Sequence, residues 1–175
     1  HSSLNKIING NKFIESYSLA KLKSLNPNTF NCCDKHRMYI EIIQNTNKDI
    51  KEGAVFNETG IIGQVVNNKS FYEVMLLTDT KSSIPLTNSK GDFYCNASGS
   101  GASDYITCSY SQLVWLDNHE LGEKFFSSGL GGIYPKGIEI GNLESIKIVD
   151  TSTTLLTIKL ISNPLHSNLF GVIKL

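Results

Sequence analysis

The stretch SSGLGGIYPKGIEIG, residues 127–141, says more about the fold than any other part of this chain. It places five glycines and one proline around a short apolar core. Glycine is needed where φ is positive or where backbones approach closely, and proline fixes φ at the entry to the next element. The stretch therefore predicts a shaped surface turn that leads into a strand at residues 137–141. It offers no nucleophile paired with a base, no set of metal ligands and no phosphate-binding loop, which favours a β-protein that works through its surface.

Composition narrows the function classes. The chain has 175 residues, of which 40% are hydrophobic, enough for the core of one large domain or two small ones. Its 16 basic and 16 acidic residues cancel, and Arg37 is the sole arginine. Specific binding of DNA or RNA usually relies on a basic face with arginine forks, so nucleic acid is not an expected partner. No apolar run approaches the ~18 residues that a membrane-spanning helix needs.

Short apolar runs separated by turn residues continue from residue 15 to the C-terminus. Met38, Ile40 and Ile42 alternate along one of them, and no long run shows helical periodicity. This pattern predicts an all-β protein, either a barrel or a sandwich. Residues 1–14 differ, because their apolar side chains are near helical spacing. They are either the end of a helical or coiled-coil segment or a frayed terminus, since Asn9-Gly10-Asn11 disfavours a helix.

Two of the four cysteines lie on neighbouring strands. Cys95 belongs to a predicted strand at 91–97 and Cys108 to one at 104–111, and alternation points both side chains toward the core. If the hairpin turns between Gly101 and Ala102, the two cysteines lie directly opposite and within reach of a disulfide; the alternative is a pair of buried free thiols. No Cys-x-x-Cys occurs and the histidines stand apart, so neither a metal site nor a cofactor is expected.

The same hairpin carries two tyrosines on its polar face. Tyr94 and Tyr105 are predicted to point outward among aspartate, asparagine, serine and threonine side chains. Exposed tyrosines of this kind are common in protein interfaces, and they are also common as ordinary surface residues. Both interpretations stay open at the level of the sequence.

Several motifs occur in a fixed order. They are GAVFN (53–57), GIIGQVV (60–66), VMLLTD (74–79), IP (84–85), GE (122–123) and the glycine–proline stretch. Together they resemble the extracytoplasmic domain of the bacterial rod-shape-determining MreC family, from about residue 16 to the C-terminus. The glycine–proline stretch and the earlier GIIG are specific in combination, although either alone would be weak. Gln64 stands where the family often has a basic residue, and the segment 91–115 fits the family pattern poorly.

The resemblance implies a fold. It implies two small β-barrels, the first built from residues 15–55 plus 133–175 and the second inserted at 56–132. It also implies a coiled coil and a single membrane helix upstream, which would tether the domain on the periplasmic side of the bacterial inner membrane.

The resemblance also implies a function. The chain is expected to be a non-enzymatic scaffold of the complex that elongates the cell wall. It would bind and position, or even activate, a class B penicillin-binding transpeptidase for side-wall peptidoglycan synthesis and rod shape. The expected partners are this transpeptidase, the shape protein MreD and further copies of the chain itself.

Aromatic residues of the second barrel are the candidate anchors for a protein partner, because a buried aromatic side chain can supply much of a binding energy. The first candidates are Tyr94, Tyr105 and Phe93. The second candidates, which are equally good core residues, are Phe125, Phe126 and Tyr134.

Two other functions compete with the scaffold. A trypsin-like β-barrel hydrolase would need a triad, and His36, Asp79 and Ser128 follow the right order, but no glycine-framed nucleophile turn surrounds the serine. A module that binds peptidoglycan glycans directly would need an aromatic platform beside polar groups. Trp115 is the candidate platform, although its apolar neighbours favour a place in the core.

Overall fold

The fold consists of β-strands throughout. The computed structural model describes residues 17–26, 34–44, 52–69, 71–111 and 118–174, and these ranges contain twelve strands and no helix. Nothing in the described ranges is therefore a helix long and apolar enough to cross a bilayer. The helical segment expected at 1–14 lies outside the described residues.

The first barrel is closed by six antiparallel strands in the order β1–β12–β3–β4–β5–β2. They are β1 (Ser18–Leu25), β2 (Arg37–Gln44), β3 (Gly53–Asn57), β4 (Gly60–Asn67), β5 (Tyr72–Leu76) and β12 (Leu169–Ile173). Alternation explains the core of this barrel, because Met38 and Ile40 of β2 point inward and meet Val74 of β5 and Phe170 of β12. Closure removes the exposed sheet edges that would otherwise invite pairing with other chains.

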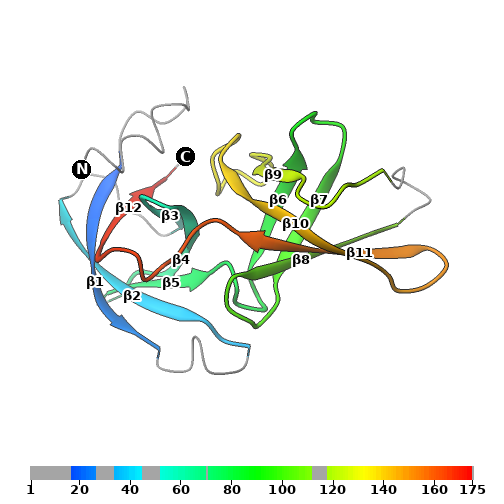
Figure 1. The fold of residues 1–175 in the computed structure, drawn as a ribbon. Coiled ribbons are helices and arrows are strands. Elements are labelled where there is room, and N and C mark those ends of the chain that lie inside the picture. The colour runs from blue at the N-terminus through cyan, green and yellow to red at the C-terminus, as the bar shows by residue number, and fades with distance from the viewer. Residues whose placement is uncertain (1–16, 27–33, 45–51, 70, 112–117, 175) are drawn as a thin grey trace.

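The second barrel is closed in the order β10–β11–β8–β7–β6–β9. Its strands are β6 (Ser83–Asn88), β7 (Tyr94–Gly99), β8 (Tyr105–Ser111), β9 (Lys124–Ser127), β10 (Glu139–Ile148) and β11 (Thr153–Leu160). Figure 1 shows the two barrels side by side, with the β10–β11 hairpin extending away from the first barrel. The prediction of two small packed β-barrels is therefore confirmed.

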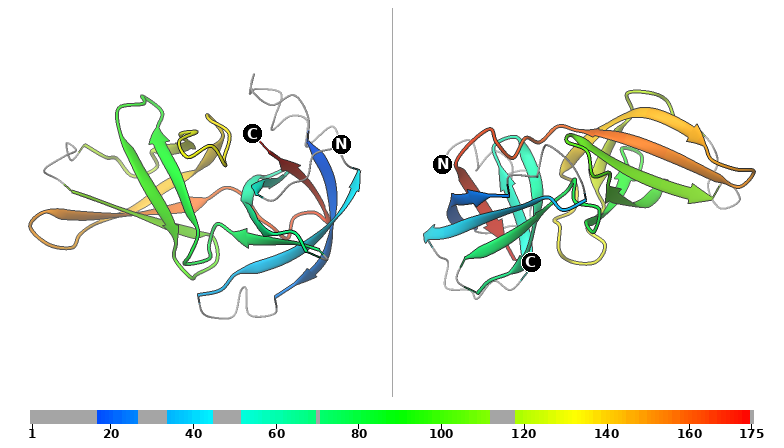
Figure 2. Two further views of the ribbon diagram at one scale, coloured as in Figure 1. Left: turned by 180° about the vertical axis from the view of Figure 1, so that it is seen from behind. Right: turned by 90° about the horizontal axis from the view of Figure 1, so that it is seen from below.

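The strand order corrects the expected domain limits of 15–55 plus 133–175 and 56–132. β4 and β5 close the first barrel, and β10 and β11 close the second, so the inserted barrel runs from β6 to β11. The glycine–proline stretch was expected to return the chain to the first barrel. Instead it connects β9 to β10, which pair with each other inside the second barrel. Figure 2 shows from two further sides that β1 (blue) and β12 (red), the first and last strands, lie together in the first barrel.

A buried carboxylate anchors the linker between β5 and β6. Asp79 is 1% exposed and accepts hydrogen bonds from the backbone N–H of His36 at 2.8 Å and of Lys81 at 2.9 Å. Its Oδ2 also accepts from Nε of Arg37 at 2.8 Å. Burial alone would raise the pKa of Asp79, but these hydrogen bonds and the charge of Arg37 outweigh it and hold the pKa below the usual value.

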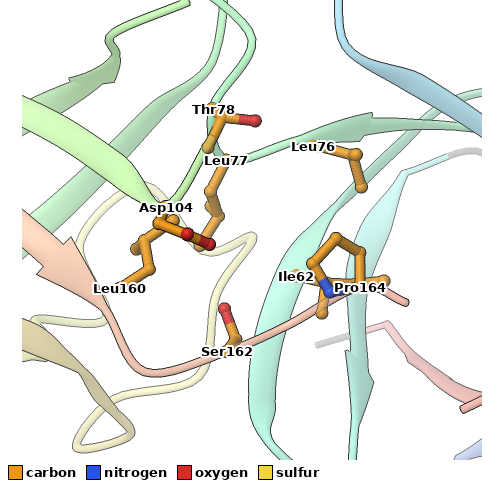
Figure 3. A pocket seen from close by; sticks show the side chains of 8 residues that line it. All are labelled: Ile62, Leu76, Leu77, Thr78, Asp104, Leu160, Ser162 and Pro164. Carbon is orange, nitrogen blue, oxygen red and sulfur yellow. The ribbon is translucent and has the colours of Figure 1, made fainter. Parts of the chain in front are cut away.

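Glycine lets the second barrel approach this linker. A Cβ on Gly99 would lie 2.0 Å from the carbonyl oxygen of Asp79, so no larger residue fits there without a backbone shift. The boundary between the two barrels beside this linker is here called the seam, and Figure 3 shows the side chains that line it. Between Leu77, Leu160 and Pro164 a space of about 10 Å³ remains, which is room for about one water molecule. The seam is thus close-packed.

Candidate partner-binding site

The outer face of the second barrel carries a row of four side chains across four neighbouring strands. Tyr94 of β7 lies opposite Thr87 of β6, Thr87 opposite Phe126 of β9, and Phe126 opposite Glu139 of β10. Directly paired residues point to the same face, so these four form one outward row, here called the aromatic row. Tyr94 is 41% exposed and Phe126 is half-buried. The Lys124 ammonium lies 3.3 Å from Glu139 Oε1 and gives the row a charged end.

Tyr105 lies on the same outer face but not in the aromatic row. The carbonyl oxygen of Tyr105 accepts the N–H of Ser100 at 3.4 Å, so Tyr105 lies level with Ser100. Ser100 is six residues after Tyr94 in the chain. At ~3.3 Å per residue the two tyrosines are about 20 Å apart. A hydrogen bond to Glu144 and the charge of that carboxylate raise the pKa of the Tyr105 hydroxyl. The two predicted anchors therefore belong to separate parts of the surface.

Three of the six predicted anchors are core residues. Phe93, Phe125 and Tyr134 are at most 3% exposed, which rules out direct contact with a partner in this conformation. Phe93 lies edge-on to Tyr110, with 5.1 Å between ring centroids, and also contacts the ring of His119. For Phe93 the physical reason is alternation, because this residue directly precedes β7 and points to the same inward side as Cys95, whereas Tyr94 faces outward.

Tyr134 has a structural task in the glycine–proline loop. Its hydroxyl donates to Oε1 of Gln64 in the first barrel at 3.1 Å, and burial raises its pKa well above the ordinary value. Gly129 makes the loop fold tightly, since its φ is 81° and a Cβ would lie 2.8 Å from the Cβ of Lys136. Ser127 Oγ donates to the carbonyl of Pro135 and closes the base of the loop. The loop thus fastens one barrel to the other through Tyr134. Its tip stays exposed, with Leu130 58% exposed and Gly131 and Gly132 at positive φ, so the predicted shaped surface turn is confirmed.

The Cys95–Cys108 disulfide is present, with 6.3 Å between the two Cα atoms. The predicted pairing is confirmed, but the predicted register is wrong. Ser98 lies opposite Thr107, so that Cys108 faces Ala97 and reaches Cys95 diagonally. The reason is a longer turn, in which Gly101 and Asp104 both adopt positive φ. The disulfide ties β7 to β8 beyond the last pair of their ladder.

Within the described ranges, β10 has an uncovered strand edge that was not predicted from the sequence. Val149 donates its N–H to Thr153 at 2.9 Å, and hydrogen-bonded pairs alternate with non-bonded ones along an antiparallel ladder. Ile146 and Ile148 therefore direct their backbone N–H and C=O groups away from β11. On that side the pairing with β9 and the residues just before it reaches only as far as Leu143, and within the described ranges no hydrogen bond reaches these two residues.

Apolar side chains accompany this β10 edge. Ile148 is 65% exposed, Val149 55% and Ile146 38%. Ile146 lies opposite Leu156, which is fully buried, so the exposed isoleucines continue the inner face of the barrel outward along the hairpin. Exposed apolar groups that gather in this way are typical of interaction surfaces. The sequence does not predict this exposure, because the run ESIKI (residues 144–148) has the pattern of an ordinary half-buried strand.

Comparison with known proteins places the chain in a family. The family model described as "Rod shape-determining protein MreC, barrel core" matches residues 32–174. The chain belongs to the MreC family. The cell shape-determining protein MreC of Haemophilus influenzae is 32% identical over 106 residues, which are 57% of this chain and 30% of that protein. Its counterpart in Escherichia coli is 28% identical over 95 residues, 54% of this chain and 25% of that protein. The chain spans less than a third of the length of these curated relatives.

Solved MreC structures share the fold. MreC from Pseudomonas aeruginosa superposes with a TM-score of 0.76 at 22% identity, covering 91% of this chain and 99% of that one. MreC from Helicobacter pylori, solved in a complex with the penicillin-binding protein PBP2, gives a TM-score of 0.65 at 18% identity, covering 90% and 96%. The MreC family determines cell shape and is not a family of enzymes.

His36, Asp79 and Ser128 do not form a catalytic triad. Asp79 contacts the backbone N–H of His36, whereas the ring Nδ1 of His36 lies 2.6 Å from Oγ1 of Thr78. Ser128 is 6% exposed, and its Oγ accepts the N–H of Leu130 at 3.3 Å. All three candidates of the hydrolase alternative thus have structural partners. Trp115, the platform of the glycan alternative, lies outside the described residues.

Proposed function

We propose that this MreC-family chain is a non-enzymatic scaffold that binds and positions a class B penicillin-binding transpeptidase on the periplasmic side of the inner membrane. The observation that carries the proposal is the β10 edge, where exposed apolar side chains occur together with backbone groups that have no hydrogen-bond partner among the described residues. A barrel presents a fixed surface, so little ordering entropy is lost on binding. The complex of a related MreC with PBP2 supports a partner of this class.

The β10 edge suits a strand of the partner. Main-chain hydrogen bonds from Ile146 and Ile148 would supply affinity, and their side chains would supply an apolar contact. The aromatic row with Tyr94 and Phe126, and separately Tyr105, are further proposed contacts on the same barrel. Lys147, on the opposite face of β10 from the isoleucines, makes no ion pair among the described residues, and it would favour a partner carboxylate.

Activation of the transpeptidase is part of the proposal. A scaffold activates an enzyme only if it binds the active conformation more tightly than the inactive one. A tenfold preference needs about 1.4 kcal/mol, which is within the reach of one well-buried apolar anchor. The proposal also includes a membrane tether upstream, contact with the shape protein MreD, and association with further copies of the chain.

The test is a binding titration of this chain against the purified periplasmic region of the transpeptidase. Ile148→Lys should weaken binding by tenfold or more, because an exposed apolar anchor becomes a charge that the interface must desolvate. Leu165→Lys is the matched control, since Leu165 is 52% exposed on the connection from β11 to the first barrel. Equal affinities of both variants and the wild type would overturn the proposed surface. An undetectable wild-type interaction would overturn the proposed function.

A further inference from the structure

A second surface feature lies on the first barrel, away from the proposed partner surface. A shallow hollow of about 210 Å³ is lined by Tyr39, Asn67, Lys69, Phe71 and Glu73. Glu73 of β5 lies opposite Tyr39 of β2 on one side and opposite Asn67 of β4 on the other. These three side chains therefore form one outward row on three neighbouring strands, and Phe71 stands just before β5.

The polar groups of the hollow are fixed but not saturated. Oε1 of Glu73 accepts from the hydroxyl of Tyr39 at 3.3 Å and from Nη1 of Arg37 at 3.4 Å. Among the described residues, no hydrogen bond reaches the other oxygen of Glu73, and no carboxylate pairs with Lys69. Asn67 uses its Oδ1 for the N–H of Lys69 at 3.1 Å, which leaves its amide NH₂ as a donor. The hollow thus offers donors and acceptors at once.

Two aromatic rings complete the wall. Phe71 is 40% exposed, with the Lys23 ammonium 5.2 Å from its ring centroid. Burial raises the pKa of Tyr39 above its ordinary value, and the charge of Glu73 raises it further. Tyr39 is therefore a neutral phenol at physiological pH, and its hydroxyl can both donate and accept. Ring faces beside mixed polar groups are typical of small-molecule sites.

We propose that this hollow binds a single neutral sugar ring of a glycan strand. A pyranose has an apolar C–H face that can lie on the Phe71 ring, and a rim of hydroxyls that donate to Glu73 and accept from Asn67 and Lys69. The volume is below the ~300 Å³ at which ordinary ligand pockets begin, which suits one ring.

This inference goes beyond the proposed scaffold and would add direct contact with a cell-wall type of glycan. The probe is chitotetraose, a neutral β-1,4-linked tetramer of N-acetylglucosamine, titrated into ¹⁵N-labelled chain and followed by NMR. Saturable shifts are expected at the amides of Asn67, Lys69 and Glu73, with a Kd of about 1 mM, as a contact limited to one ring permits.

Matched variants separate a built site from general stickiness. Phe71→Ala should weaken chitotetraose binding by about tenfold or more, and Phe71→Tyr should retain it, because the ring is what matters. Tyr94→Ala is the control, since Tyr94 on the second barrel is 41% exposed and Phe71 40%. The absence of saturable shifts, shifts confined to the second barrel, or equal losses in Phe71→Ala and Tyr94→Ala would overturn the proposal. Transpeptidase binding by Phe71→Ala should be unchanged, so the two proposals can fail separately.

Discussion

Replacement of Asp79 by asparagine tests how the two barrels are joined. The Asp79 carboxylate is 1% exposed and accepts from Nε of Arg37 and from the N–H groups of His36 and Lys81, all within 2.9 Å. Asparagine keeps the shape of the side chain but removes its charge and one of its two acceptor oxygens. The change therefore preserves the shape of the side chain but removes the ion pair with Arg37 and one hydrogen-bond acceptor.

The size of the effect follows from the partner that remains. The Arg37 side chain is 12% exposed and keeps Glu73 as an anionic neighbour, at 3.4 Å. Removal of one partner of a buried ion pair costs ~3–5 kcal/mol, and the remaining contact to Glu73 places the expectation for Asp79→Asn at about 3 kcal/mol. That is a large part of the ~5–15 kcal/mol that stabilises an ordinary domain.

The assay is equilibrium unfolding in urea at neutral pH, with Asp150→Asn as the control. Asp150 sits at the exposed tip of the β10–β11 hairpin, where its Oδ1 accepts the N–H groups of Ser152 and Thr153 at 2.8 Å. It therefore makes similar backbone hydrogen bonds without burial or an arginine. A much smaller loss in Asp150→Asn than in Asp79→Asn is expected. Equal losses, or a loss below about 1 kcal/mol in Asp79→Asn, would refute the view that the buried ion pair holds the linker.

The pH dependence gives an independent check. The pKa of Asp79 is lower in the folded state than in the unfolded chain. The unfolded state then binds more protons, so the stabilisation is fully present above the unfolded pKa of ~3.9 and is lost as the pH falls through the folded pKa. Asp79→Asn should therefore flatten the decline in stability below about pH 4. An unchanged acid limb would contradict the assignment.

Three further changes test the seam and the hairpin by the same unfolding assay. Gly99→Ala should cost about 2 kcal/mol because its Cβ would meet the linker carbonyl at 2.0 Å, and a neutral result would mean that the linker yields. Joint replacement of Cys95 and Cys108 by serine should cost about 3 kcal/mol, since their disulfide closes a loop with a sequence separation of 13; a wild-type midpoint would contradict this. Tyr134→Phe should cost about 1–2 kcal/mol by leaving Gln64 without its buried donor, whereas increased stability would show that the bond is not needed.

Local patterns were sufficient to locate most strands. The expected strand at 104–111 corresponds to β8, which begins one residue later, and the run in which Met38, Ile40 and Ile42 alternate lies in β2. Alternation and turn residues are local properties, so they can be read from neighbouring positions. Membership of a barrel is not local. β10 pairs with β9 and β11 of the second barrel, and nothing within residues 139–148 indicates that the strand belongs to this barrel rather than to the first.

The candidate site was only partly predictable for the same reason. Alternation along β7 predicted that Tyr94 points outward, and it could equally have placed Phe93 in the core. Tyr134 lies in an irregular loop, where no period indicates burial. The exposure of Ile146 and Ile148 depends on how far the pairing with β9 extends, and β9 begins at Lys124, well before these residues in the chain. The extent of pairing between strands that are distant in the sequence thus determines which apolar side chains stay exposed for a partner.

The most direct test of the scaffold is a footprint on β10. Amide hydrogen exchange of this chain is measured alone and with saturating periplasmic region of the transpeptidase. The N–H groups of Ile146 and Ile148, which point away from β11, should exchange readily in the free chain and become protected in the complex. Unchanged exchange at these two amides in a saturated complex, or protection confined to the first barrel, would contradict the proposal that the transpeptidase binds at the β10 edge.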